Sequence, residues 1–127
     1  MSTTWILVAN ARQARLYANH GPNKGLELVE EANALPESKT ERSSRMRDNQ
    51  QQLANNFADQ LVDQLYYGRS RGDYARAIIV APPQFMGMLN ARLDKPTAQL
   101  ISSRLDKDYT KTPQNELCAH LSSCLCV

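Results

Sequence analysis

The stretch AIIVA, residues 77–81, decides the fold of this chain. Its continuous run of apolar and β-branched residues is typical of a central strand that is covered on both faces. Pro82 and Pro83 end the strand. A helix is predicted next, because apolar residues recur with helical spacing at Phe85, Met86, Leu89 and Leu93. After this helix, Pro96 permits only a fresh helical turn. A strand is then predicted at residues 100–105, and the right-handed crossover rule makes the two strands parallel neighbours.

A long helix is predicted upstream of this strand. Four apolar residues recur every four positions and place one stripe along it: Leu53, Phe57, Leu61 and Leu65. Gly68 is expected to end this helix, because glycine is favoured at helix C-termini. The polar stretch before the helix, about residues 36–48, has no apolar period and is predicted to be an exposed basic loop.

Three short strands are predicted near the N-terminus, at residues 5–9, 14–18 and 26–30. Turn-forming residues between them favour an antiparallel meander, and the third strand alternates as a half-exposed strand does. At the other end of the chain, Thr112 is expected to cap a last helix that has Pro113 at its first position. The side chains that this helix is predicted to bury are Leu117, Leu121 and Cys124.

Composition agrees with a single domain. The chain has 127 residues, of which 42% are hydrophobic and 22% charged, and its formal net charge is +2. That charge is too small to indicate nucleic-acid binding by itself. The predicted class is therefore α/β, with residues 1–127 as one domain. Helices pack on a mixed five-stranded sheet, in which an N-terminal antiparallel meander joins parallel strands.

The sequence also carries expectations about location. The apolar run at residues 5–9 is short and follows no basic region, so it does not resemble a secretory signal. No run approaches the roughly 20 residues that span a bilayer. A cytoplasmic location is expected, and the cysteines Cys118, Cys124 and Cys126 are interpreted as reduced thiols.

Three stretches carry a family resemblance: WILVANARQARLYANHG at 5–21, YARAIIVAPPQFMGMLNARL at 74–93 and LDKDYTKTPQNELCAHL at 105–121. In order and spacing they resemble the bacterial proteins required for attachment to host cells. This family is similar in turn to the middle domain of archaeal and eukaryotic peptide-chain release factors, which implies a mixed five-stranded sheet related to the ribonuclease H-like fold. The release-factor domain works through a Gly-Gly-Gln tripeptide that this sequence lacks, so peptide release is not implied.

Basic residues are the candidate binding site. Four lie within nine positions of the predicted loop, where they either contact phosphates or stay solvated: Lys39, Arg42, Arg45 and Arg47. Further cations strengthen the binding hypothesis if the fold gathers them near the loop: Arg69 and Arg71, and also Arg12, Arg15 and Arg76. Three aromatic residues can stack on bases or cover the edge of the sheet: Tyr66, Tyr67 and Tyr74.

Catalytic and metal sites have less support. A ribonuclease H-type nuclease needs a carboxylate on its first strand, and residues 5–9 offer none. Asp106 and Asp108 are weak candidates for a metal pair, because Lys107 between them and the missing partner ligands favour solvated or loop-capping roles. His20 is expected to be an exposed turn residue. No catalytic residue, metal or cofactor is therefore predicted.

The C-terminal segment offers soft ligands and a lipidation pattern. Cys118, His120, Cys124 and Cys126 have zinc-binding chemistry. On a helix, however, residues 118 and 120 point about 200° apart, which disfavours one shared ion. The last four residues match the C-a-a-X pattern and make Cys124 a candidate for prenylation. The pattern is short and Val is not a favoured last residue, so the end of an amphipathic helix is the preferred interpretation.

The leading functional hypothesis is a non-catalytic module that binds structured RNA or the ribosome through the basic loop. The alternatives are a divergent hydrolase or nuclease, and a protein of host attachment. Pairing between open sheet edges would produce a homodimer.

Overall fold

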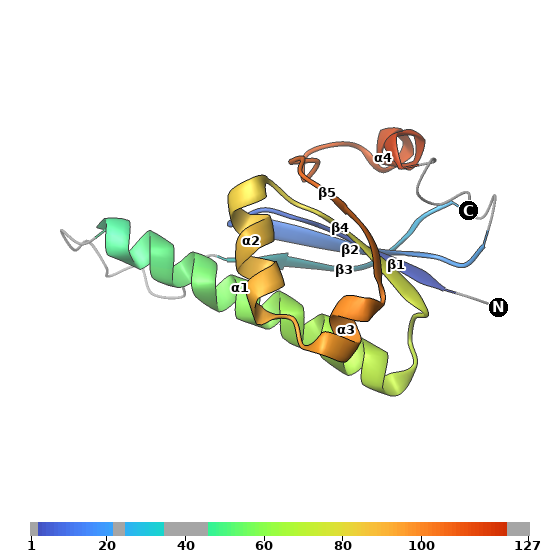
Figure 1. Cartoon of the computed structure of the whole chain (residues 1–127). Coiled ribbons are helices and arrows are strands. Elements are labelled where there is room, and N and C mark those ends of the chain that lie inside the picture. Colours follow the sequence, from blue (N-terminus) through green and yellow to red (C-terminus); the bar gives the residue numbers. More distant parts are fainter. Residues whose placement is uncertain (1–2, 22–24, 35–45, 122–127) are drawn as a thin grey trace.

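One mixed sheet with helices on both faces organises the part of the chain that the computed structural model describes, residues 3–21, 25–34 and 46–121 (Figure 1). At residues 46–51 and 118 this description covers the backbone alone. The strands are β1 (Thr4–Ala9), β2 (Gln13–Asn19), β3 (Glu27–Asn33), β4 (Arg76–Val80) and β5 (Ile101–Leu105). The helices are α1 (Met46–Arg71), α2 (Pro83–Arg92), α3 (Lys95–Gln99) and α4 (Gln114–His120).

The order of the strands is β3-β2-β1-β4-β5. β1 pairs antiparallel with β2, and β2 pairs antiparallel with β3. β4 pairs in parallel with both β1 and β5. The predicted α/β class, the meander and the parallel neighbours are therefore confirmed.

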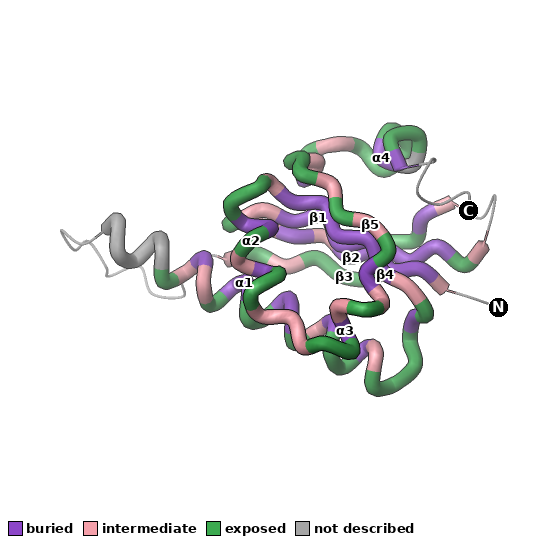
Figure 2. Tube along the Cα trace, in the orientation of Figure 1, coloured by how far each residue is buried: buried purple, intermediate pink, exposed green. Residues whose placement is uncertain are grey.

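Two hydrophobic layers hold the helices on the sheet. On β1, Trp5 and Leu7 face a core that also includes buried side chains of α1 and α2. Ile6 and Val8 point the other way, into a second core that α4 completes. Since both faces are covered, every residue of β1 is buried, and the central strands are purple in Figure 2. No helix within the described residues has both the length and the apolarity needed to cross a membrane.

The long helix α1 differs from its prediction at both ends. It begins at Met46, so residues 46–48 of the predicted loop are helical. Met46 and Arg47 are good helix formers, and an acidic residue such as Asp48 is favoured in the first turn of a helix. The helix also continues through Gly68 to Arg71. Gly72, at φ 77°, provides the left-handed residue of the C-terminal cap. The amide of Gly72 donates to the Arg69 carbonyl, and the next amide donates to the Gly68 carbonyl.

Gly68 has a packing role instead. Trp5 and Tyr74 stack with ring centroids 4.6 Å apart beneath α1. A Cβ atom at residue 68 would lie 2.5 Å from the Trp5 ring and 3.0 Å from Tyr74. Glycine is required here because the aromatic pair occupies the space that any side chain would fill.

The edge strand β3 is exposed on both faces, contrary to the predicted alternation (Figure 2). A register shift opposite Leu16 and Tyr17 leaves Val29 as an extra residue. Leu28 and Val29 are 44% and 46% exposed. The prediction failed because burial at an edge depends on which elements reach it. Homodimer formation through an edge stays a prediction, and the bulge and the three glutamates of β3 are features that protect edges from pairing.

The shorter helices agree with the sequence to within a residue or two. Asp94 caps α3 by accepting a hydrogen bond from the Thr97 amide, and Pro96 lies in the first turn as predicted. α4 begins at Gln114, one residue later than expected, with Pro113 rather than Thr112 as its N-cap. Leu117 and Leu121 are fully buried, whereas Cys124 lies outside the described residues.

Candidate functional site

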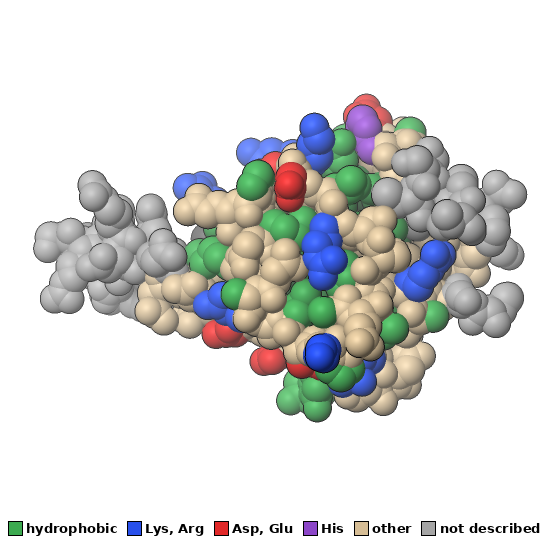
Figure 3. Space-filling model, viewed as in Figure 1, with side chains coloured by type: hydrophobic (Ala, Val, Ile, Leu, Met, Phe, Trp, Pro, Cys, Tyr) green, Lys and Arg blue, Asp and Glu red, His purple; other side chains and the backbone are tan. Residues whose placement is uncertain are grey.

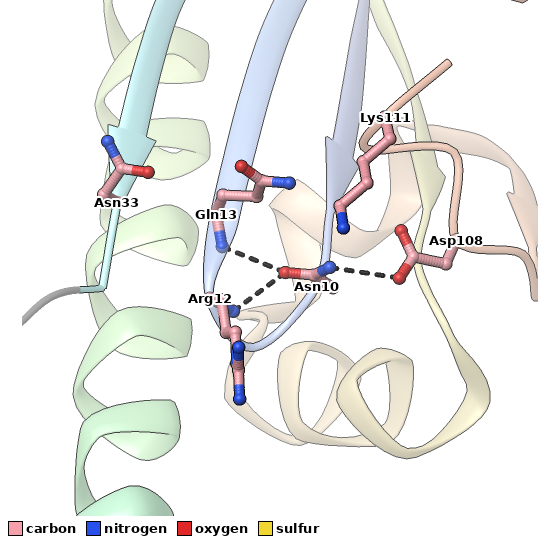
Figure 4. A pocket seen from close by; sticks show the side chains of 6 residues that line it. All are labelled: Asn10, Arg12, Gln13, Asn33, Asp108 and Lys111. Atoms are coloured by element: carbon pink, nitrogen blue, oxygen red, sulfur yellow. Dashed lines mark hydrogen bonds between the residues drawn. The ribbon is translucent and has the colours of Figure 1, made fainter.

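An open, polar pocket lies at the end of the sheet where β1 and β2 are joined (Figure 4). The strands β1 and β4 are parallel, and the chain leaves their carboxyl ends in opposite directions, to β2 and to α2. Ligand sites of open α/β sheets favour such a point. The cavity measures about 550 Å³, and its lining residues are Asn10, Arg12, Gln13, Asn33, Asp108 and Lys111.

Asn10 joins the two segments that form the pocket. Its amide nitrogen donates to Asp108 Oδ2 at 3.0 Å and to Thr110 Oγ1 at 3.1 Å. Its amide oxygen accepts from the backbone amides of Arg12 and Gln13 at 2.8 and 2.9 Å. The side chain of Asn10 therefore has every donor engaged, and it fastens the β1–β2 turn to the segment after β5.

Asp108 holds a loop together rather than acting as a base. Its Oδ1 accepts from the amide and the hydroxyl of Thr110, at 3.1 and 2.6 Å. Burial by itself would raise the pKa of Asp108. The hydrogen bonds from Thr110 and Asn10, with the charge of Lys111, outweigh burial and leave this pKa below its usual value. A carboxylate with a lowered pKa is a weak general base at neutral pH.

This lowered pKa predicts an acid-sensitive contribution to stability. The contribution is present above the unfolded-state pKa of about 3.9 and is lost as the pH falls through the lower folded-state value. We expect the stability difference between wild type and D108N to be largest near neutral pH and to shrink steadily below pH 4. Urea unfolding of both proteins at several pH values measures it. D106N is the control, since no described residue donates a hydrogen bond to Asp106; an equal pH response in both variants would contradict the prediction.

The pocket also contains two cations that are free of ion pairs within the described residues. Lys111 extends toward Asn10 and Asp108, whereas Arg12 projects from the turn to the opposite side (Figure 4). Neither forms an ion pair with a described residue, although Lys111 acts on Asp108 through its charge. The pocket therefore presents positive charge on both sides of Asn10.

Those predicted basic residues that the structure describes do not gather in one place. Lys39, Arg42 and Arg45 lie outside the described residues, and Arg47 lies in the first turn of α1. Arg69 is 22 residues further along this helix, a separation of about 33 Å at 1.5 Å per residue. Figure 3 shows Lys and Arg side chains scattered over the visible face, with acidic residues between them.

Arg69 and Arg71 are engaged near the C-terminal end of α1. Arg69 donates to Thr97 at 3.0 Å, lies 3.7 Å from Asp94 and covers the ring of Tyr66. It thereby links α1 to α3. The guanidinium of Arg71 pairs with Asp73 at 2.8 Å. Two further arginines from the predicted set lie elsewhere. Arg15, on β2, lies 3.6 Å from Glu31. Arg76 is the first residue of β4, at the end of the sheet opposite the pocket.

Two of the three candidate tyrosines are accessible. Tyr66 and Tyr67 are 40% and 55% exposed and contact each other edge to face. Tyr74 is buried, and its hydroxyl donates to the Leu65 carbonyl at 2.6 Å. Burial raises the pKa of Tyr74 to about 12. Its place in the core leaves this ring unavailable for stacking on a base.

His20 lies at the end of the sheet opposite the pocket. Its ring nitrogens lie 3.3 Å from Thr3 Oγ1 and 2.9 Å from Glu27 Oε1, so it bridges the start of β1 and the start of β3. The side chains of His20 and Glu27 are 54% and 68% exposed. His20 is thus exposed, as expected, and its contacts with Thr3 and Glu27 give it a structural role in joining two strands.

Metal ligands do not converge in the described part of the chain, where no group of three His, Cys, Asp or Glu residues forms a site. Asp108 is committed to its loop. The zinc hypothesis stays a prediction, because the side chains of Cys118, Cys124 and Cys126 lie outside the description. His120, the remaining member, stacks on Tyr109. The prenylation candidate Cys124 is likewise outside it.

A family model described as "Protein required for attachment to host cells" matches residues 5–46 and 33–121. The chain belongs to this family. The resemblance of its three segments to the host-attachment family is therefore confirmed. Among proteins with curated functions, none matches the chain significantly.

Two solved structures are similar to this host-attachment family member in fold. One, described as an archaeal protein, has a TM-score of 0.56 and 12% identity over 84% of this chain and 30% of that chain. The other is the archaeal translation termination factor aRF1, with a TM-score of 0.53 and 13% identity over 96% of this chain and 38% of that chain. The chain thus spans about a third of each, and the likeness confirms the predicted release-factor-like fold.

Most residues of the pocket were not predicted from the sequence. Arg12 and Asp108 were candidate residues, whereas Asn10, Gln13, Asn33 and Lys111 were not. One signal was available, because Asn10 directly follows a fully buried strand, where polar site residues are often placed. Nothing in the sequence showed that residues about a hundred positions apart line the same cavity.

Proposed function

We propose that this protein is a cytoplasmic binding module that contacts structured RNA with the pocket end of its sheet. The observation that carries the proposal is the pair of cations, Arg12 and Lys111, which line a polar pocket without an ion pair to any described residue. Cations that form no ion pair at contact distance are available for phosphates, and phosphate contacts dominate the affinity of proteins for nucleic acids.

The predicted basic loop is the second part of the proposal. β3 finishes at Asn33, which lines the pocket, and the chain continues from there toward the N-terminal end of α1 (Figure 1). The four basic loop residues named above lie in this part of the sequence, between β3 and the first turn of α1. On the basis of the sequence, we include them with Arg12 and Lys111 in the proposed binding set. Arg69 and Arg71 are left out, because their ion pairs and their distance separate them from it.

The release-factor-like fold is consistent with a partner in translation. The similar translation termination factor acts in that process, although the chain corresponds to only 38% of its length. The absence of Gly-Gly-Gln argues against peptide release, so binding rather than hydrolysis is proposed. A ribosomal or transfer RNA is the kind of structured RNA that this comparison favours.

An enzymatic role is the second candidate, since Asp108 meets polar groups in a pocket. Its saturated hydrogen bonds and lowered pKa make it a poor base, which ranks a hydrolase or nuclease below a binder. The family description supports a third candidate, a role in attachment to host cells.

Co-sedimentation with ribosomes and with tRNA across a salt series tests the proposal. We expect wild type to bind with an affinity that falls steeply with salt. Two variants should weaken it: R12A/K111A and R42A/R45A/R47A, with a slope of log K against log salt that is smaller by about 0.9 for each phosphate contact removed. R76A/K95A is the matched control, because it removes two positive charges elsewhere on the molecule. If wild type shows no binding at low salt, the proposal is wrong. If R76A/K95A loses as much affinity as the two variants do, binding is a nonspecific attraction between charges and does not involve the pocket.

A further inference from the structure

We infer that the pocket recognises the sugar–phosphate backbone of RNA, with Gln13 and Asn33 contacting a ribose 2′-hydroxyl. The inference rests on the proposed function and adds a way to distinguish RNA from DNA. It follows from asking which polar groups of the pocket remain available after the internal hydrogen bonds are counted.

The first group of pocket residues, Asn10 and Asp108, already forms hydrogen bonds within the protein. Asn10 uses both amide hydrogens on Asp108 and Thr110, and its oxygen accepts two backbone amides. Asp108 in turn accepts three hydrogen bonds from Asn10 and Thr110. These side chains form a rigid floor, and a ligand would have to break their bonds to use them.

The second group, Gln13 and Asn33, is available to a ligand. The side-chain amides of Gln13 and Asn33 have no hydrogen-bond partner within the described residues. The two residues are direct partners in the register of β2 and β3, so their side chains leave the same face of the sheet. Facing residues on antiparallel strands have Cβ atoms about 5 Å apart. Two neighbouring amides thus offer donors and acceptors together.

A ribose hydroxyl is the complementary ligand. It donates one hydrogen bond and accepts others, and each amide can do both. The 2′-hydroxyl is the group by which proteins tell RNA from DNA at a given position. Lys111 and Arg12, on either side of Asn10, are placed to contact the phosphates that flank such a ribose (Figure 4).

The chemistry of the lining favours the backbone over a base. All six lining residues carry polar or charged side chains, and no aromatic ring is among them. Bases that are bound out of a stack normally lie against aromatic or apolar groups, whereas sugars and phosphates need polar partners on several sides. A volume of about 550 Å³ is within the range of ligand pockets.

The test compares an RNA hairpin with the DNA hairpin of the same sequence, measured by fluorescence anisotropy with wild type and Q13A/N33A. We expect wild type to prefer RNA, and the variant to lose about five- to hundredfold of RNA affinity, the contribution of two hydrogen bonds, with DNA affinity unchanged. The salt slope should stay the same, because no phosphate contact is removed. Q60A/Q99A, which removes two exposed amides outside the pocket, is the control and should resemble wild type.

The outcomes separate this inference from the proposed function. RNA binding with no preference over DNA, or with a preference that Q13A/N33A leaves intact, overturns the inference while the binding module stands. Failure of wild type to bind either hairpin, ribosomes or tRNA overturns both. A loss of RNA and DNA affinity together in Q13A/N33A also counts against a 2′-hydroxyl contact, and circular dichroism of the variant checks that it is folded.

Discussion

Gly68→Ala is expected to lower the free energy of unfolding by about 1–3 kcal/mol, the usual cost of overpacking. Alanine is the better helix former, so helix propensity alone predicts the opposite sign, a gain of up to about 1 kcal/mol. The clash decides, because the new Cβ would lie 2.5 Å from two atoms of the Trp5 ring. That ring is 6% exposed and stacked on Tyr74, so it has little room to move. Urea denaturation of the purified protein measures the change.

Gly87→Ala is the matched control. Gly87 lies within α2, and a Cβ atom there would have no neighbour within 4 Å. Only the propensity effect remains, and the substitution should stabilise the protein by up to about 1 kcal/mol. Opposite signs at these two helical glycines would support the close packing of α1 on Trp5. If Gly68→Ala also stabilised the protein, the described contact between α1 and β1 would be wrong.

Leu117→Ala is expected to cost about 2–5 kcal/mol, the range for removing a buried leucine side chain. Leu117 is fully buried in the second core, together with Ile6 and Val8 of β1. α4 is short, so few other side chains can compensate for the cavity. The loss should appear as a lower unfolding midpoint in thermal denaturation.

Asn115→Ala provides the comparison, since Asn115 is exposed on the same helix. A surface change of this kind normally alters stability by less than about 0.5 kcal/mol. A similarly small effect of Leu117→Ala would mean that α4 does not cover this face of the sheet in solution.

The sequence predicted those features that depend on neighbours along the chain. The buried strands β1 and β4, the apolar stripe of α1 and the fresh turn at Pro96 follow from local periodicity and backbone chemistry, and the structure confirms them. The parallel pairing of β4 with β5 followed from the handedness of crossover connections. Each of these signals is complete within about 25 residues.

Other features needed the tertiary structure. Gly68 resembles a helix terminator in sequence, but its role is set by Trp5, which is 63 positions earlier in the numbering and in contact only after folding. The alternation of β3 suggested one buried face, but the strand lies at the edge of the sheet, where exposure depends on neighbouring elements and on a bulge.

The candidate site shows the same division. The sequence identified cations and a carboxylate as residue types, and it left open which of them lie together. Asn10 and Asp108 are 98 positions apart and share a hydrogen bond, because the parallel strands β1 and β5 have their carboxyl termini at the same end of the sheet. Local sequence therefore determined the elements and their order, since helices and strands are specified by short-range periodicity. Only the folded chain decided the site, because side chains from distant segments meet there through the topology of the sheet.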